Sequence, residues 1–365
     1  MEKLLFMLLV CLAITSCGGS SGNTPCTTLD CKTLKYSLFM ADVNFSQANP
    51  AATNIQLIAS SSFQDMTHPR ISPDKLWVAY TTYNDTNGEG CATVDQRANT
   101  EIKATRLDGS QTKTIISKTN SELTTNNYWY GINNEFTFLA GAPGVTKIYR
   151  AQTDSAMNLI SGPTEVTIPA TILPFDPHAI SDTQLVYGGQ YDSSGSDVKS
   201  IFLQTLNPSG MPTGLSLGRD SVGTILLATD VMENDPKISP DGNNIAFMRQ
   251  APNSGVNGFG FRIFVVPIAN PLSEANISAS LGSTIANNDA LPEWVDNTTL
   301  VFSNIDSTVT FNTRTIWTMK SDGTGRKQIS LPTGYRYSDI IPFLSGSGNQ
   351  KIIVSAEKID AICAP

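Results

Sequence analysis

Charge is scarce in this sequence, and positive charge is the scarcer kind. Only 15% of the 365 residues are charged, with 24 Lys and Arg against 32 Asp and Glu and a formal net charge of −8. An ordinary globular protein has about a quarter of its residues charged. No cluster of Lys or Arg occurs along the chain. Because binding to nucleic acid requires a basic patch, we expect no nucleic-acid partner.

A long hydrophobic run is also missing, except at the start of the chain. Residues 4–14 read LLFMLLVCLAI and follow a single lysine, Lys3. This pattern is typical of a signal peptide and is too short for a membrane-spanning helix. The sequence therefore predicts that residues 1–16 are a signal peptide and that no other segment spans a bilayer.

The end of this segment resembles the lipobox of bacterial lipoproteins. It reads LAITSC, with the small residues Thr15 and Ser16 directly before Cys17. The resemblance implies that Cys17 becomes the lipidated first residue of the mature protein, and Gly18 after it implies sorting to the outer membrane. An ordinary signal peptide followed by a free cysteine is the alternative. Residues 17–33 begin with a Gly/Ser-rich stretch, which predicts a flexible tether.

Cysteine is sparse as well. The six cysteines are Cys11, Cys17, Cys26, Cys31, Cys91 and Cys363. When the signal-peptide residue and the lipidated residue are set aside, four remain in an oxidising compartment. An even number predicts two disulfides, for which three pairings are open. A zinc site is the alternative, but the pair Cys26 and Cys31 has no matching second pair.

Histidine is the rarest of the catalytic residue types, with only His68 and His178. Residues 214–218 match the Gly-x-Ser-x-Gly pattern of a hydrolase nucleophile elbow, in which the acid and the histidine follow the serine. Both histidines precede Ser216, and no helical segment follows it. We therefore expect a strand or loop here and no serine nucleophile.

What the sequence does contain is a repeat. HPRISPDKLWVAYTT (residues 68–82) and DPKISPDGNNIAFMR (residues 235–249) share Pro-x-Ile-Ser-Pro-Asp followed by an apolar stretch. Ser-Pro-Asp predicts a tight turn, and the flanking residues predict strands. Two more strands follow in each copy, so the unit is four antiparallel strands in roughly fifty residues, the size of a propeller blade.

Six copies of this unit are predicted. Their aligned apolar positions are Ile71, Ile132, Ile180, Ile238, Trp294 and Leu344. The sixth copy stops after two strands, whereas two strands near the N-terminus, residues 34–43 and 54–59, have no inner partners. Joining these pairs completes the sixth blade and closes the ring. The sequence predicts an all-β, six-bladed propeller of four-stranded antiparallel blades over residues 34–365.

The best copies, residues 69–80, 236–248 and 315–330, resemble the TolB-like β-propeller repeat. The shared pattern is Pro-x-Ile/Trp-Ser-Pro-Asp-Gly, a strand, Ile-Trp-x-Met-x-x-Asp-Gly and Lys-Gln-Ile-Ser. The resemblance covers about residues 34–357 and implies a six-bladed propeller, a repeat that carries scaffolds and enzymes alike. TolB itself has an α/β domain before the propeller, so we expect a different protein with the same repeat.

Ring closure would bring the four remaining cysteines to one seam. Cys363 could pair with Cys26 or Cys31 and join the termini, or with Cys91 and join neighbouring blades. Either bond would stabilise the ring, typically by about 2–4 kcal/mol. The sequence leaves the pairing open.

The channel of the predicted ring is lined by the innermost strands. Polar residues fall at or near the start of these strands, and they are His68, His178, Asp176, Asp235, Asp289 and Asp339. One interpretation is that they cap strand ends and hold water. The other is a ring of imidazole and carboxylate ligands for a divalent cation. The resemblance lends it some support, since some TolB-like lyases of pectic oligosaccharides use a channel His cluster with a metal. We favour the first interpretation and expect no cofactor.

A dense aromatic run, Tyr128, Trp129 and Tyr130, begins the second blade and is a possible partner-binding site at the channel mouth. The function expected is a monomeric propeller, lipid-anchored to the bacterial outer membrane on its periplasmic face or at the cell surface, that binds a protein or peptide partner as a scaffold. The alternatives are a lyase-like carbohydrate-active enzyme that uses the His/Asp channel and a surface sensor or adhesion subunit. Catalytic residues are not assigned.

Overall fold

The protein, described by a computed structural model, is built of β-strands throughout the residues that the structure describes. These are residues 35–61, 64–84, 99–119, 128–130, 134–142, 145–168, 172–179, 184–191, 199–206, 212–216, 233–250, 261–270, 273–278, 287–306 and 314–358. In these ranges there is no helix with the length and apolar character needed to cross a membrane. The expectations for residues 1–16 and 17–33 and for the cysteines fall outside the described residues. Those cysteines are Cys17, Cys26, Cys31, Cys91 and Cys363.

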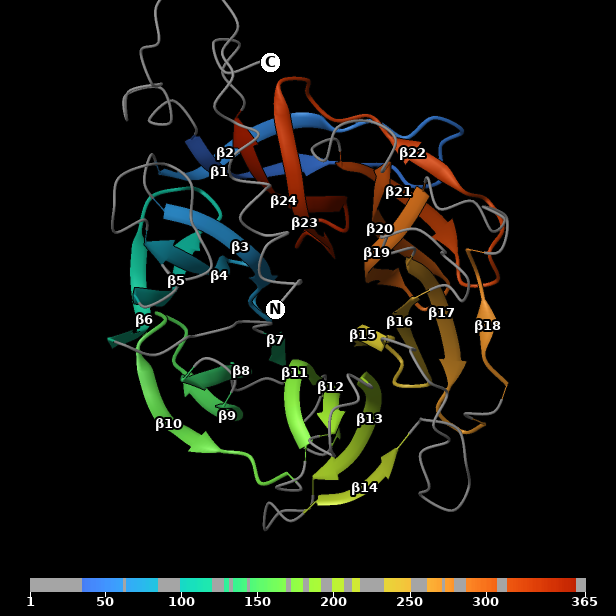
Figure 1. Cartoon of the computed structure of the whole chain (residues 1–365). Coiled ribbons are helices and arrows are strands. Elements are labelled where there is room, and N and C mark those ends of the chain that lie inside the picture. Colours follow the sequence, from blue (N-terminus) through green and yellow to red (C-terminus); the bar gives the residue numbers. More distant parts are fainter. Residues whose placement is uncertain are drawn as a thin grey trace, which may run out of the picture.

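The strands form six antiparallel sheets of four strands each. Figure 1 shows these sheets as blades around a central axis, with β3, β7, β11, β15, β19 and β23 innermost. The first blade comprises β3 (Gln64–Ile71), β4 (Trp77–Asn84), β5 (Asn99–Arg106) and β6 (Thr112–Thr119). The second comprises β7 (Tyr128–Tyr130), β8 (Glu135–Ala142), β9 (Val145–Thr153) and β10 (Leu159–Glu165). The third comprises β11 (Ile172–Ala179), β12 (Gln184–Tyr191), β13 (Lys199–Leu206) and β14 (Pro212–Ser216).

The fourth blade comprises β15 (Glu233–Ile238), β16 (Asn244–Gln250), β17 (Phe261–Pro267) and β18 (Ala275–Asn276). The fifth comprises β19 (Asn287–Asp296), β20 (Thr299–Asp306), β21 (Arg314–Lys320) and β22 (Lys327–Ile329). The closing blade comprises β23 (Tyr335–Leu344), β24 (Gln350–Lys358), β1 (Lys35–Asp42) and β2 (Thr53–Ser61). The predicted six-bladed, all-β propeller is confirmed.

The ring closes as the sequence predicts, by pairing the two ends of the described chain. β1 lies antiparallel to β24 over its whole length, with Leu38 opposite Ser355. The segment between β1 and β2 also reaches the fifth blade, where Ser330 N donates to Pro50 O at 3.0 Å and Ala52 N donates to Ser330 O at 2.9 Å. Because β1 pairs with β24, the second strand of the closing blade has no open edge that could pair with another chain.

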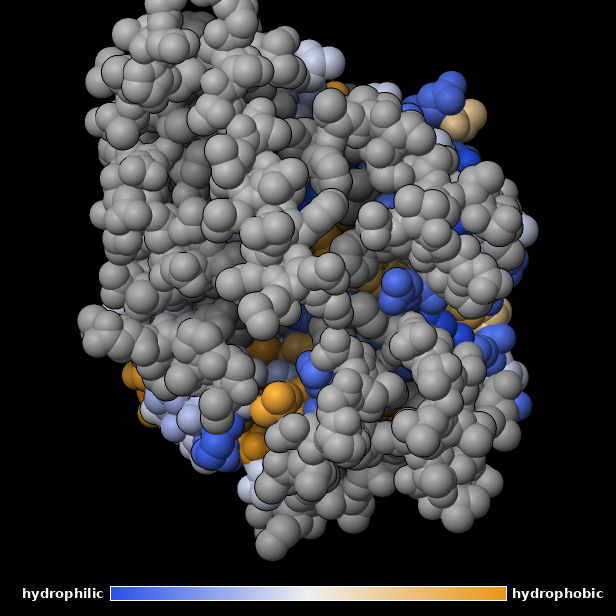
Figure 2. Space-filling model, viewed as in Figure 1, coloured by the Kyte–Doolittle hydropathy of each residue, from blue (hydrophilic) through white to orange (hydrophobic). Residues whose placement is uncertain are grey.

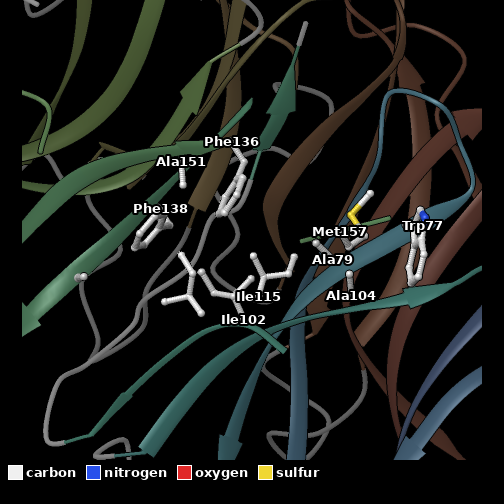
Figure 3. Close-up of a cluster of buried hydrophobic side chains, with 11 residues drawn as sticks. Trp77, Ala79, Ile102, Ala104, Ile115, Phe136, Phe138, Ala151 and Met157 are labelled. Carbon is white, nitrogen blue, oxygen red and sulfur yellow. The ribbon is translucent and has the colours of Figure 1, made fainter. Parts of the chain in front are cut away.

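The hydrophobic core lies between neighbouring blades. Figure 3 shows Ile102 and Ala104 of the first blade in one cluster with Phe136 and Phe138 of the second, and all four are fully buried. Alternate residues of each strand point to opposite faces of the sheet, so every blade packs on two neighbours. Burial of this kind stabilises by about 25 cal/mol per Å² of apolar surface.

The Ser-Pro-Asp turns form as predicted. In the first blade Ser72 Oγ donates to Asp74 Oδ1 at 2.6 Å and accepts from Trp77 N at 2.9 Å. In the fourth blade Ser239 Oγ donates to Asp241 Oδ1 at 2.6 Å and accepts from a backbone N–H at 2.9 Å. The serine thus satisfies buried backbone groups where the chain reverses.

The aligned apolar positions are wrong in two copies. Ile71, opposite Val78, is the second residue to pair after a bulge, and the residues in the same place of the third and closing blades are Ala179 and Ile341. The sequence alignment put Ile180 and Leu344 there, one and three residues too late. These two copies lack Ser-Pro-Asp, so nothing in their sequence fixes the register. Ile132 lies outside the described residues.

Candidate functional site

Four of the innermost strands share a backbone irregularity near the axis of the ring. His68, Asp176, Asp235 and Leu291 have φ angles of 51°, 47°, 50° and 55°, and each precedes a proline. The strand ladder skips two residues at each of these places, so each is a β-bulge. A left-handed conformation costs an ordinary residue about 1–2 kcal/mol. Its presence in four blades marks a shared structural device.

Two residues after each bulge stands a buried polar side chain. These are Arg70, His178, Lys237 and Glu293, which are 3%, 2%, 2% and 8% exposed. They occupy the variable position of the Pro-x-Ile motif. The repeat motif therefore points to Arg70, Lys237 and Glu293 as axial residues. The sequence-based prediction for the first and fourth blades names only the residues that precede the proline, His68 and Asp235.

Three of these side chains form ion pairs across the axis. Glu293 Oε1 lies 2.9 Å from an Arg70 guanidinium nitrogen and 3.6 Å from Lys237 Nζ. Lys237 Nζ also lies 4.0 Å from Asp235 Oδ1. The first, fourth and fifth blades are thus joined by charges at the centre, and we refer to Arg70, Asp235, Lys237 and Glu293 as the axial cluster.

The aspartates and histidines predicted for the channel gather only in part. His68, Asp235 and Asp339 line one small cavity together with the axial cluster. Asp176 lies beside Asp235, because Asp235 N donates to Asp176 Oδ2 at 3.4 Å. His178 Nδ1 accepts from Ile238 N at 3.2 Å and so joins the third blade to the fourth.

Asp289 lies elsewhere, and its expected place in the channel is wrong. Its side chain is fully buried and accepts two hydrogen bonds from Arg326, at 2.5 and 2.8 Å, and one from Ser278 Oγ at 2.7 Å. The Arg326 guanidinium lies over the rings of Phe302 and Trp317. Asp289 precedes the bulge by two residues, so the pleat places it within the fifth blade's packing.

Burial and neighbouring charge change the pKa values of this site in opposite directions. Burial, then the negative charge of Asp176, raises the pKa of Asp235 to about 8 against the attraction of Lys237. Burial, then the positive charges of Lys237 and Arg70, holds the pKa of His178 well below its ordinary value. Near neutral pH Asp235 is therefore protonated and His178 uncharged.

His68 and Asp339 form a second pair of titratable groups. Burial lowers the pKa of His68, although the negative charge of Asp339 opposes this. Burial would raise the pKa of Asp339, but the charge and backbone N–H of His68, together with Arg314 and Arg70, lower it. His68 Nδ1 is buried and has no hydrogen-bond partner among the described residues.

The cavity at this site is small. About 10 Å³ is open to the centre of a water molecule, which is room for about one water. Among the described residues, no group of three or more His, Cys, Asp or Glu side chains is placed to hold a metal ion. The arrangement is a buried, charged cluster that joins the first, fourth and fifth blades at the axis.

The other predicted residues have these positions. Tyr128, Trp129 and Tyr130 form β7, the innermost strand of the second blade, and pair with β8. Ser216 ends β14, an outer strand, opposite Phe202, which agrees with the prediction of a strand at this motif.

Known structures share the propeller architecture. The chain is similar to the hydrazine synthase of Kuenenia stuttgartiensis, with a TM-score of 0.55 and 12% identity over 84% of this chain and 47% of that one. It also matches the β-propeller domain of the Trilobed protease from Pyrococcus furiosus, with a TM-score of 0.47 and 11% identity over 90% and 92% of the two chains. An oligogalacturonate lyase in complex with manganese gives a TM-score of 0.47 and 12% identity over 78% and 70%. No protein-family model and no curated protein matches the sequence. Identities this low indicate a common fold only.

Proposed function

We propose that this protein is a lipid-anchored propeller of the bacterial cell envelope, built from TolB-like repeats, that binds a protein partner through its outer rim. The anchor is proposed from the lipobox pattern that ends at Cys17. The binding role rests on one observation, the uneven distribution of exposed apolar side chains around the ring.

Six large hydrophobic side chains of the described residues are exposed. They are Ile55, Leu57, Leu76, Leu159, Ile160 and Leu344. All belong to the closing, first and second blades, which are neighbours in the ring, and none of the described residues in the other three blades is among them. Figure 2 shows apolar surface at the rim close to the position of β10. Apolar surface gathered on one side of a soluble protein favours a protein-binding side.

The exposed strands β2 and β10 carry the most exposed of these side chains. Leu57 is 52% exposed and Ile160 is 59% exposed. All seven residues of β10 are exposed. We refer to the exposed apolar residues of β2 and β10 together as the rim strip. They lie on the outermost strands of the closing and second blades, one on each side of the first blade, and they suit a partner that contributes apolar side chains over polar surroundings.

The lyase-like alternative depends on the channel. Asp235 and His68 have the shifted pKa values that acid–base groups require, but the cavity that they line admits about one water molecule. A sugar residue would need a much larger space. A surface sensor or adhesion subunit would use the same rim strip from outside the cell, so this alternative concerns the location of the protein.

Capture of the partner tests the proposal. The lipidated protein is purified from detergent-solubilised membranes after cross-linking, as wild type and as Leu57→Ser and Ile160→Ser. Gln328→Ala, at an exposed residue of β22 in the fifth blade, is the matched control. We expect the same partner with wild type and control, and about tenfold less with the rim variants. A partner retained equally by all four proteins, or no partner with any of them, would contradict the proposal.

Two further variants separate the parts of the proposal. Cys17→Ser should move the protein from the membrane to the soluble fraction. Trp129→Ala tests the aromatic run of residues 128–130, which remains a proposed second contact. If Trp129→Ala abolishes capture and the rim variants do not, the partner binds at the channel mouth and the rim strip is the wrong surface.

A further inference from the structure

A second cavity lies away from the axis, at the seam between the fifth blade and the closing blade. Its volume is about 300 Å³, at the lower end of the range for small-molecule sites. Phe45 and Ser46 reach it from the β1–β2 connection, Gln350 from the start of β24, and Lys320 and Lys327 from the fifth blade. We call this space the seam cavity, and segments far apart in the sequence meet around it.

Several of the hydrogen-bond acceptors and hydroxyls that line the seam cavity are engaged by the chain itself. Asp296 Oδ1 accepts from Thr298 N at 2.7 Å and from Thr298 Oγ1 at 2.9 Å. Thr318 Oγ1 donates to Leu300 O at 2.8 Å. Thr299 Oγ1 accepts from Lys320 Nζ at 2.8 Å. These bonds use part of the capacity of the lining to receive hydrogen bonds from a ligand.

Donors remain open in the same lining. Lys320 Nζ uses one of its three hydrogens on Thr299, and Lys327 Nζ donates to Gln47 O at 2.8 Å and to Ser46 O at 3.5 Å. Gln350 Oε1 accepts from a backbone N–H at 3.1 Å. Its amide nitrogen, with two donors, bonds to none of the described residues. A ligand for this site must therefore supply acceptors.

Charge and apolar surface restrict the ligand further. Two lysines face one carboxylate, Asp296, so the lining carries a net positive charge in a chain whose formal net charge is −8. The side chain of Phe45 belongs to the buried cluster of this seam and lines the cavity. An anion with an apolar part matches both features.

We propose that the seam cavity binds a small organic carboxylate, whose oxygens accept hydrogen bonds from Lys320, Lys327 and Gln350 and whose apolar part lies against Phe45. Such a ligand contacts the β1–β2 connection, the fifth blade and β24 together. It therefore stabilises the closed ring, since a ligand that binds only the folded state adds to its stability.

A matched pair of probes tests the proposal on the full-length protein. The acid is 3-phenylpropionate and the neutral control is 3-phenylpropionamide, and inorganic phosphate serves as an anion without an apolar part. Binding is followed by the backbone amide resonance of Gly325, which lines the cavity, with Gly162 of β10 as the distant reference. Thermal unfolding is the second readout.

We expect the acid to shift the Gly325 resonance saturably, to leave Gly162 unchanged and to raise the unfolding temperature. The amide should bind about tenfold more weakly, because it cannot form charge-assisted hydrogen bonds with the lysines. Equal binding of acid and amide, or equal binding of phosphate, would contradict the assignment, and so would an unchanged Gly325 up to the solubility limit of the acid.

Two lysine variants locate the site. Lys320→Met and Lys327→Met should each weaken binding of the acid about tenfold. Lys147→Met, at an exposed lysine of β9 that pairs with Glu165, is the control and should bind like wild type. Lys327 also holds backbone carbonyls of the β1–β2 connection, so Lys320→Met decides the outcome if Lys327→Met unfolds. Loss of binding in Lys147→Met, or none in Lys320→Met, would overturn the proposal.

Discussion

Glu293 is the central negative charge of the axial cluster. It is the only carboxylate of the axial cluster that ion-pairs with both buried cations, Arg70 and Lys237. Charges taken out of water are costly, and they persist only where partners compensate them. Asp235 offers little compensation, because its raised pKa keeps it protonated at neutral pH.

Replacement of Glu293 by Gln should therefore be strongly destabilising. It removes the carboxylate that ion-pairs with both buried cations, and breaking a buried pair costs about 3–5 kcal/mol. Urea unfolding at neutral pH measures the effect. Glu165→Gln is the control, since its pair with Lys147 is about half exposed and should contribute little. Similar stabilities for the two variants would show that the axial ion pairs are unimportant.

The pKa of Asp235 makes a prediction about pH. In the folded protein its pKa is about 8, above the value of about 3.9 in an unfolded chain. The folded state binds this proton more tightly, so the stabilising contribution is complete below about pH 4 and is lost as pH rises toward 8. Asp235→Asn lacks this titration.

The stability of wild type minus that of Asp235→Asn should fall between pH 5 and pH 7, by up to about 1.4 kcal/mol per pH unit. Denaturant unfolding across that range gives the difference. The pKa values of the two histidines are lowered, so both histidines make the protein less stable as pH falls. This effect is the same in the wild type and in the variant, and it largely cancels in the difference between them. A constant difference would mean that Asp235 is ionised throughout.

At the level of strands and turns, the sequence predicts the structure most completely at the turns where the chain reverses direction. Ser-Pro-Asp fixed both the turn and the register of the flanking strands in the first and fourth blades, because the serine and aspartate side chains bond to the turn. In the third and closing blades, which lack this motif, the predicted positions are one and three residues out, whereas Trp294 of the fifth blade is in the expected place without it. A strand that is buried on both faces reads as a continuous apolar run and not as an alternating pattern, so its apolar residues alone do not fix the register.

The bulges of the innermost strands explain why the sequence predicts only part of the channel lining. The direction of a side chain next to a bulge depends on the bulge, and a sequence pattern does not show where two residues of one strand oppose a single residue of its partner. His68 and Asp235 were found because they precede Pro in the motif. Arg70, Lys237 and Glu293 were missed although they stand in its variable position, and Asp289 was placed in the channel because it lies only two residues before the bulge.

The first and fourth blades provide a natural test of turn conformation. Lys75 has a φ of 59° and donates to Ser72 O at 2.9 Å, and in the fourth blade Gly242, with a φ of 75°, makes the same bond to Ser239 O at 2.8 Å. Glycine adopts this left-handed conformation readily, whereas lysine adopts it at a cost in free energy. Lys75→Gly should therefore stabilise the protein by about 1 kcal/mol, and Gly242→Lys should destabilise it by about as much.

Thermal unfolding of both variants measures these changes. The exposed side chain of Lys75 has no ion pair among the described residues, so the substitution isolates the backbone effect. A loss of stability in Lys75→Gly would show that chain entropy outweighs the conformational strain at this turn.

At the scale of the whole molecule, closure of the ring depends on the N-terminal strands. β1 fills the place between β24 and β2, and without it β24 has an open edge. A chain that begins at residue 62 should lose cooperative unfolding and self-associate, because an exposed strand edge pairs with other chains. Size-exclusion chromatography with light scattering measures this. A monomer that unfolds like the full chain would contradict the importance of closure.

The ring has a charged cluster at its axis and exposed apolar side chains in three neighbouring blades, and our proposal is that the partner binds the outer surface. Site-specific photo-cross-linking in living cells tests this claim most directly, with a benzophenone amino acid introduced at Leu57, at Ile160 or, as the reference, at Gln328. We expect one common protein cross-linked from positions 57 and 160 and none from position 328. Cross-links of equal yield from all three positions, or none from 57 and 160, would contradict the account.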